Sequence, residues 1–153
     1  MIRVLAAATI ALASIPTFDP HPLEGVWRIS FPWHIEVVNG VVTPTMETGE
    51  LRVEVKGDSL VATVARTPTA DTPTPRPIRM AALRLGIGEV SFEARDNVTM
   101  ASPDGGERTM TAISVWVLKP AGDQLAGTLE RKLEGAPSPG HGPLPLTGSR
   151  VRP

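Results

Sequence analysis

LRVEVKGDSLVATV, residues 51–64, carries the clearest structural pattern in the sequence. Apolar and charged residues alternate from Leu51 to Lys56, which is the period of a strand with one buried face. Gly57-Asp58 suits a type II′ turn, because glycine in first place adopts a positive φ without strain. Such a turn pairs apolar residues on the core face: Val55 with Leu60, Val53 with Ala62, and Leu51 with Val64. Arg52 and Thr63 then face outward, so residues 51–64 are predicted to form a β-hairpin.

Short strands and turn signals continue along the chain. Asn39-Gly40 is a strong hairpin signal that joins Ile35–Val38 to Val41–Thr43. Pro32 interrupts the preceding apolar run, so one strand is expected from Gly25 to Phe31 and another from Trp33. Further strands are predicted at Ile78–Leu85, Glu89–Arg95, Asn97–Ser102, Glu107–Leu118, Leu125–Leu133 and Leu144–Arg152, with a proline-rich loop at Thr67–Pro77.

This pattern predicts an all-β fold of eight to ten strands. No convincing amphipathic helix follows the N-terminal segment. A sandwich and a barrel both fit such a series of short strands. We favour an antiparallel up-and-down β-barrel, because the strands follow one another as hairpins and closure removes the exposed edges.

The N-terminal segment has the features of a signal peptide. Arg3 precedes an apolar run from Val4 to Leu12, and Ala11-Leu12-Ala13 fits a cleavage site before Ser14. Residues 1–13 are therefore predicted to be removed on export, which makes the protein secreted or periplasmic. The run is too short for an integral membrane span. The alternative is a first strand or a frayed helix. Residues 14–22 contain three prolines and are expected to form an extended arm.

Composition excludes several classes of function. The chain has 153 residues, which fits one domain, and its formal net charge is −1 with no basic cluster. A nucleic-acid partner would require a basic face. Three tryptophans, three phenylalanines and no tyrosine disfavour stacking of sugars or bases. Cysteine is absent, so disulfides, thiol nucleophiles and thiolate metal sites are excluded.

Three elements carry a family resemblance. The first strand opens with Leu23-x-Gly25-x-Trp27, the last contains Leu146-Thr147-Gly148-Ser149-Arg150, and a Gly-Asp-x-Leu turn occurs at Gly57 and again at Gly122. Residues 23–153 thereby resemble the lipocalin-like (calycin-type) β-barrel domains of bacterial exported proteins. The resemblance implies a structural plug of Gly25, Trp27 and Arg150, with the arginine lying over the indole at the closed end. The alternative role for Arg150 is binding of an anionic ligand.

No pattern of catalytic or metal-binding residues is evident. His21, His34 and His141 are far apart, and no His-x-x-x-His spacing occurs. No serine lies in a Gly-x-Ser-x-Gly elbow. Glu50 with Glu54, and Glu89 with Glu93, fall on outward strand faces. We therefore predict no catalytic residue, no metal site and no cofactor.

The barrel interior provides the remaining candidates for a binding site. Met80, Phe92, Met110 and Trp116 lie on apolar strand faces and are predicted to line a ligand cavity. The alternative is that they fill a solid core. Trp33 and His34, directly after Pro32, are predicted to form a contact at the barrel rim.

These observations predict an exported, non-enzymatic barrel that binds a small apolar ligand or an extracytoplasmic partner protein. One alternative is an interaction module, like a protease inhibitor, that uses residues 14–22 as its contact. Another is an enzyme that acts in the barrel cavity.

Overall fold

The computed structural model describes residues 20–137 and 140–153, all of whose regular structure is strand. The predicted signal segment and most of the predicted arm, residues 1–19, lie outside the described residues. Eight strands follow one another: β1 (Gly25–Val38), β2 (Val41–Lys56), β3 (Ser59–Arg66), β4 (Ile78–Leu85), β5 (Val90–Ala101), β6 (Glu107–Ala121), β7 (Gln124–Leu133) and β8 (Leu144–Arg150).

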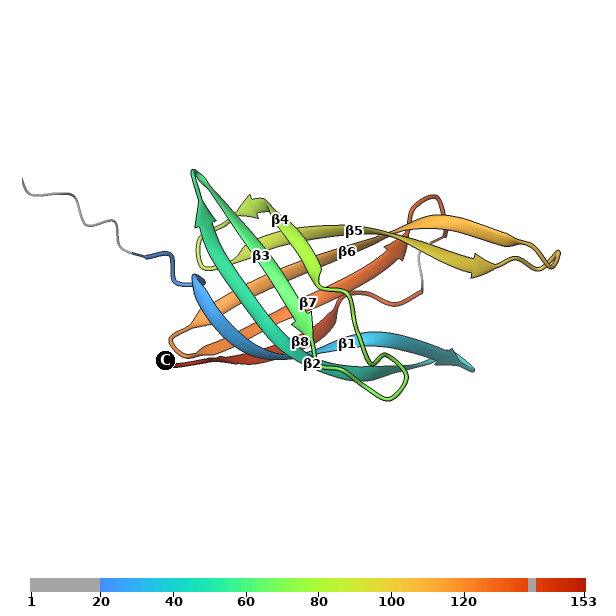
Figure 1. Cartoon of the computed structure of the whole chain (residues 1–153), viewed down its shortest axis with the longest axis horizontal. Coiled ribbons are helices and arrows are strands. Elements are labelled where there is room, and N and C mark those ends of the chain that lie inside the picture. The colour runs from blue at the N-terminus through green and yellow to red at the C-terminus, as the bar shows by residue number, and fades with distance from the viewer. Residues whose placement is uncertain (1–19, 138–139) are drawn as a thin grey trace, which may run out of the picture.

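The strands form a closed barrel in which each pairs antiparallel with its neighbours in sequence, and β1 closes the ring against β8 (Figure 1). The all-β, up-and-down barrel predicted from the sequence is thus confirmed. Closure depends on four β1–β8 residue pairs, from Trp27 opposite Arg150 to Ser30 opposite Thr147. Gly148 allows this approach, because a Cβ there would lie 2.8 Å from the carbonyl oxygen of Arg28.

The hairpin at residues 51–64 has the predicted register, with Val55 opposite Leu60 and Leu51 opposite Val64. Gly57 has a φ of 61°, as the turn requires. The face assignment was wrong for Val55, whose exposed fraction is 48%. Val55 lies next to the end of β2, where the core no longer covers it. The other five residues predicted for the core face are buried: Leu51, Val53, Leu60, Ala62 and Val64.

The predicted interruption at Pro32 is wrong, because β1 runs without a break from Gly25 to Val38. The register instead shifts between Pro32, opposite Met46, and His34, opposite Thr45. Trp33 is therefore the extra residue of a β-bulge. Proline is tolerated at bulges and at strand edges. Both conditions hold here, since β8 pairs with β1 only as far as Ser30.

The two ends of the barrel differ. At the closed end, where β1 begins and β8 ends, the described chain starts and terminates (Figure 1). At the open end, the β1–β2 and β5–β6 hairpins project beyond the other strands (Figure 1). Their outer halves pair only within each hairpin, because β3 pairs with β2 only from Gly49 and β7 pairs with β6 only from Ala112. The apolar core fills the barrel between the two ends.

Candidate functional site

Trp27 lies at the closed end of the barrel and is fully buried. Its Nε1 donates a hydrogen bond of 2.9 Å to the carbonyl oxygen of Leu23. The guanidinium carbon of Arg150 lies 4.2 Å from the centre of the Trp27 ring. The contact that the sequence predicts between Trp27 and Arg150 is therefore present.

The guanidinium of Arg150 has a protein partner at each nitrogen. Nη1 donates to the carbonyl oxygen of Glu24 at 2.7 Å, and Nη2 donates to that of Pro22 at 2.6 Å. Nε lies 3.7 Å from a carboxylate oxygen of Asp123. Through these contacts, Arg150 joins the segment before β1 to the end of β8 at the closed end of the barrel.

Gly25 makes room for Arg150. Its φ is 123°, a conformation that side chains rarely adopt, and a Cβ at this position would lie 2.8 Å from Nη1 of Arg150. The third member of the predicted plug therefore contributes by the absence of a side chain.

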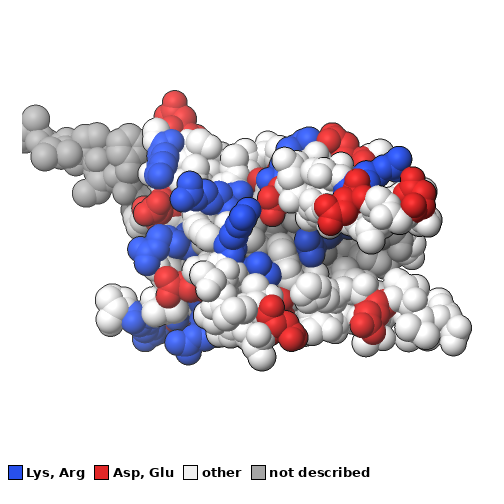
Figure 2. Space-filling model, turned by 45° about the vertical axis from the view of Figure 1, so that its right-hand side comes forward, with Lys and Arg blue, Asp and Glu red and all other residues white. Residues whose placement is uncertain are grey.

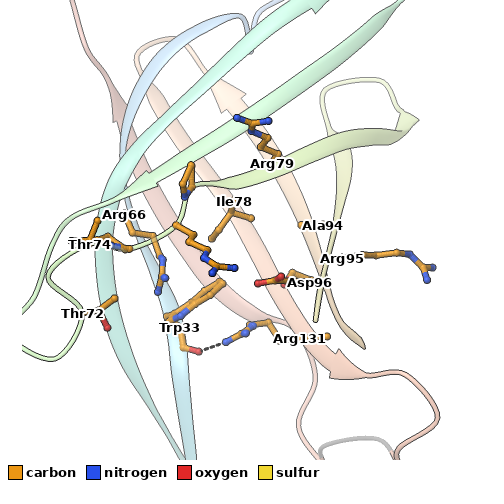
Figure 3. A pocket seen from close by; sticks show the side chains of 15 residues that line it. Trp33, Arg66, Thr72, Thr74, Ile78, Arg79, Ala94, Arg95, Asp96 and Arg131 are labelled. Carbon is orange, nitrogen blue, oxygen red and sulfur yellow. Dashed lines mark hydrogen bonds between the residues drawn. The ribbon is translucent and has the colours of Figure 1, made fainter. Parts of the chain in front are cut away.

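Trp33 forms a second tryptophan–arginine cluster at the open end, which we call the mouth cluster: Trp33, Arg66 and Arg131. The guanidinium carbon of Arg131, from β7, lies 3.8 Å from the centre of the Trp33 ring, and that of Arg66, from β3, lies 4.7 Å away. Nη1 of Arg131 donates to the carbonyl oxygen of Trp33 at 2.7 Å (Figure 3). The bulge at Trp33 thus presents both its ring and its carbonyl to arginines from other strands.

The guanidinium of Arg131 has few hydrogen-bond acceptors and no ion-pair partner in the described part of the protein. Among residues 20–137 and 140–153, it hydrogen-bonds only to the Trp33 carbonyl and forms no ion pair. Its Nε is buried without a partner. Burial, followed by repulsion from Arg66, lowers the pKa of Arg131 below the usual value for arginine. Since a guanidinium has five N–H donors, most donors of Arg131 lack a protein acceptor.

Arg66 has one carboxylate partner, Glu47 of β2. Nη1 of Arg66 lies 3.4 Å from one oxygen of Glu47, and Nε2 of His34 lies 3.5 Å from the other. Nε of Arg66 is also buried without a partner in the described part of the chain. Within the described residues, the contact of Glu47 with Arg66 is thus the one ion pair made by the two half-buried arginines of the mouth cluster.

A pocket of about 400 Å³ opens beside Trp33 at the mouth. Small residues from β5 and β6 leave this space, and the proline-rich loop before β4 forms its other wall (Figure 3). The lining residues are Trp33, Arg66, Thr72, Thr74, Pro75, Arg76, Pro77, Ile78, Arg79, Ala94, Arg95, Asp96, Ala112, Ser114 and Arg131.

A second pocket of about 490 Å³ adjoins the first and shares Trp33, Ala112 and Arg131 with it. It extends to His34 and to His141 in the β7–β8 connection. In Figure 2 the surface is hollowed between the two projecting hairpins.

The other ligand-lining candidates from the sequence do not join Trp33 and His34 at the mouth. Phe92 and Trp116 are fully buried and Met80 nearly so, and all three belong to the apolar core. Phe31 connects this core to the mouth, with ring centres 5.2 Å from Trp116 and 5.9 Å from Trp33. Met110 is half-buried in the outer part of the β5–β6 hairpin, opposite Val98.

Sequence reasoning missed Arg66 and Arg131, although the strand period contained a signal. Arg66 continues the inward-facing series Leu60, Ala62 and Val64, and Arg131 lies two residues after the buried Leu129. A charged residue in an inward register is a candidate for a binding site, because a buried charge requires a partner.

Other kinds of site have no counterpart in the described residues. No group of three or more histidine, aspartate or glutamate side chains there could hold a metal ion. Those residues also include no helix with the length and hydropathy needed to cross a bilayer.

No family model and no curated protein matches the sequence. Among solved structures, the chain is similar to one titled "Monomer form of M.tuberculosis PknI sensor domain", with 18% sequence identity and a TM-score of 0.47. The similarity covers 88% of this chain and 90% of that chain. The narrower lipocalin-like assignment therefore remains a prediction from the sequence, whereas the barrel itself follows from the strand pairing.

Proposed function

We propose that the protein is an exported, non-enzymatic binding domain that takes a small molecule into the pocket beside Trp33. The observation that carries this proposal is the mouth cluster, where two half-buried arginines, each with a buried Nε that lacks a partner, border a pocket of about 400 Å³. Small-molecule sites are typically concavities of about 300–1,000 Å³, mostly apolar, with a few polar groups that orient the ligand.

The lining of the pocket fits this description. Trp33, Ile78 and Ala112 provide apolar contact surface, and the arginines provide directed hydrogen-bond donors. The barrel below Phe31 is packed with side chains, so the mouth offers space that the interior does not. A ligand would therefore bind at the open end, between the projecting hairpins, rather than deep in the barrel.

The binding test is native mass spectrometry of protein purified without denaturation. We expect a bound small molecule in the wild-type protein and in Ala126→Phe, and its loss in Ala112→Phe. Ala112 borders both pockets, so phenylalanine there occupies the ligand space. Ala126 is an exposed alanine of β7 and makes a matched control. Equal occupancy in both variants would place the ligand elsewhere and refute the proposal.

Export is tested separately. N-terminal sequencing of protein recovered from the secreted or periplasmic fraction should begin at Ser14, as the Ala11-Leu12-Ala13 site predicts. Recovery of intact Met1 in the cytoplasmic fraction would contradict this part of the proposal.

A partner protein is the second candidate, and the β1–β2 hairpin favours it. Val37, Val38 and Val41 at its tip have exposed fractions of 53%, 61% and 63%. Exposed apolar clusters commonly mark interaction surfaces. Val38→Ser combined with Val41→Ser should abolish capture of such a partner and leave small-molecule binding unchanged.

A further inference from the structure

The charges around Trp33 are unbalanced. Arg66 and Arg131 both contact the indole ring, and Glu47 alone is in ion-pair contact with either of them within the described residues. Asp96 is the only acidic residue that lines the pocket, and Figure 3 shows its carboxylate directed toward Trp33, where its charge raises the pKa of Arg131. Arg76 of the proline-rich loop also lines the pocket. The three arginines Arg66, Arg76 and Arg131 are accompanied by two carboxylates, Glu47 and Asp96, which leaves an excess of one positive charge.

The hydrogen-bond donors show the same deficit. Nε of Arg131 and Nε of Arg66 are buried without partners in the described chain, and the carbonyl of Trp33 accepts the single protein hydrogen bond of Arg131. A partly desolvated cation whose buried donors lack acceptors is costly unless an anion accompanies it. An oxyanion is the natural acceptor, because a guanidinium binds carboxylate-type groups with two parallel hydrogen bonds.

We infer that the ligand of the proposed pocket is an organic monoanion. A carboxylate or sulfonate head group binds Arg131 and Arg66, and a compact apolar body lies against Ile78, Ala94 and Ala112. This inference rests on the proposed function, which supplies the pocket, and adds the chemical class of the ligand. A single negative charge suffices, since Glu47 and Asp96 offset two of the three arginines Arg66, Arg76 and Arg131.

Arg79 and Arg95 line the pocket but do not contribute to this arrangement. Arg79 and Arg95 are exposed, and Figure 3 shows both side chains directed away from Trp33. Arg95 is paired with Glu93 and Glu134. Substitution of Arg79 is therefore a matched control for substitution of Arg131, since it removes a positive charge at the rim and leaves the residues of the mouth cluster unchanged.

The test compares two fluorescent dyes that differ by one sulfonate: 1-anilinonaphthalene-8-sulfonate, a monoanion, and N-phenyl-1-naphthylamine, which is neutral. We expect the wild-type protein to bind the sulfonate dye about tenfold or more tightly than the neutral dye, as for a charged hydrogen bond. Arg131→Met should abolish this preference and retain the neutral dye. Arg79→Gln should keep the preference, and Ala112→Phe should weaken both dyes.

The outcomes separate the two proposals. If both dyes bind equally and Arg131→Met changes neither, the pocket exists and the monoanion is refuted. If neither dye binds, or both bind Ala112→Phe as well as wild type, the proposed pocket itself fails. Displacement of the sulfonate dye by 1-naphthoate should require less competitor than displacement by 1-naphthyl phosphate. The reverse order would overturn the assignment of a single negative charge.

Discussion

The two ends of the barrel contain the same pair of residue types in opposite states. At the closed end, Arg150 stacks on Trp27, and each of its guanidinium nitrogens has a carbonyl or carboxylate partner. At the mouth, Arg131 stacks on Trp33, yet one backbone carbonyl is its single hydrogen-bond acceptor in the described chain. In the described part of the chain, two of the three buried side-chain nitrogens without partners belong to the mouth cluster, Nε of Arg66 and Nε of Arg131, and the third, Nε1 of Trp116, lies in the core.

This difference shows how one side-chain pair can serve either stability or binding. A stacked arginine with a protein partner at each nitrogen holds strands together, because breaking the contact leaves carbonyls and a carboxylate unpaired. A stacked arginine with unused donors contributes less to folding and retains its capacity for a ligand. Residues of binding sites commonly lower the stability of the fold in this way.

The tryptophans give the largest expected contrast. Trp27→Ala removes a fully buried indole and should lower the free energy of unfolding by about 3–5 kcal/mol. Trp33→Ala removes a half-buried ring and should cost less than about 2 kcal/mol. Urea denaturation of both variants measures the difference. Equal losses would mean that the mouth cluster is as structural as the plug.

Gly25→Ala should produce the next largest effect. The new Cβ meets Nη1 of Arg150, and the φ of 123° is strained for alanine, so we expect a loss of about 2–3 kcal/mol. Gly142→Ala is the control, since its Cβ meets nothing within 4 Å and its φ is not in the positive range. Thermal unfolding that is unchanged in Gly25→Ala would disprove the tight fit at the plug.

The arginines themselves provide a smaller contrast. Arg150→Met should destabilise by about 1–2 kcal/mol, because it loses the stacking contact and the hydrogen bonds to Glu24 and Pro22. Arg131→Met should be close to neutral or stabilising, since removal of a half-buried charge that Arg66 repels offsets the lost stacking and hydrogen bond to Trp33. Chemical denaturation curves test both variants. Greater destabilisation by Arg131→Met would reverse the assignment of roles.

Asp123→Asn should have the smallest effect, and that effect should depend on pH. The hydrogen bond and charge of Arg152, aided by Arg150, hold the pKa of Asp123 below its usual value. A lowered carboxyl pKa stabilises the fold above about pH 3.9, and this contribution is lost as pH falls through the folded-state pKa. The melting temperatures of wild type and variant should therefore differ at neutral pH and converge in acid. A difference that persists in acid would exclude the ionised carboxylate as its cause.

Much of the barrel could be predicted because its hairpins are specified locally. Residues 51–64 contain both the two-residue period and the turn glycine, so register followed without knowledge of the other strands. Asn39 and Gly40 have φ values of 52° and 75°, the pair of positive angles that a type I′ turn requires. The contact of Trp27 with Arg150 was anticipated through a family resemblance, since residues 123 positions apart share no local signal.

The mouth cluster was harder to predict, for two physical reasons. A proline inside an apolar run usually ends a strand, and nothing local indicates that Pro32 continues into a bulge that sets Trp33 apart from its neighbours. In addition, Arg66 and Arg131 have no local feature that sets them apart from the other charges of the chain, and charged residues mostly lie on surfaces. Their inward position becomes evident only when the strand period is extended to its last residue.

The bulge at Trp33 also divides β1 into two regions of different local stability. Trp27–Ser30, before the bulge, pair with strands on both sides, so exposure of their amides to exchange with solvent requires opening of the barrel. Residues after it pair only with β2, and that hairpin can open while the ring stays intact. A molecule bound at Trp33 contacts the bulge, where these two regions of β1 meet. Occupancy would thus slow amide exchange in the projecting hairpin and leave the rates around Trp27 almost unchanged.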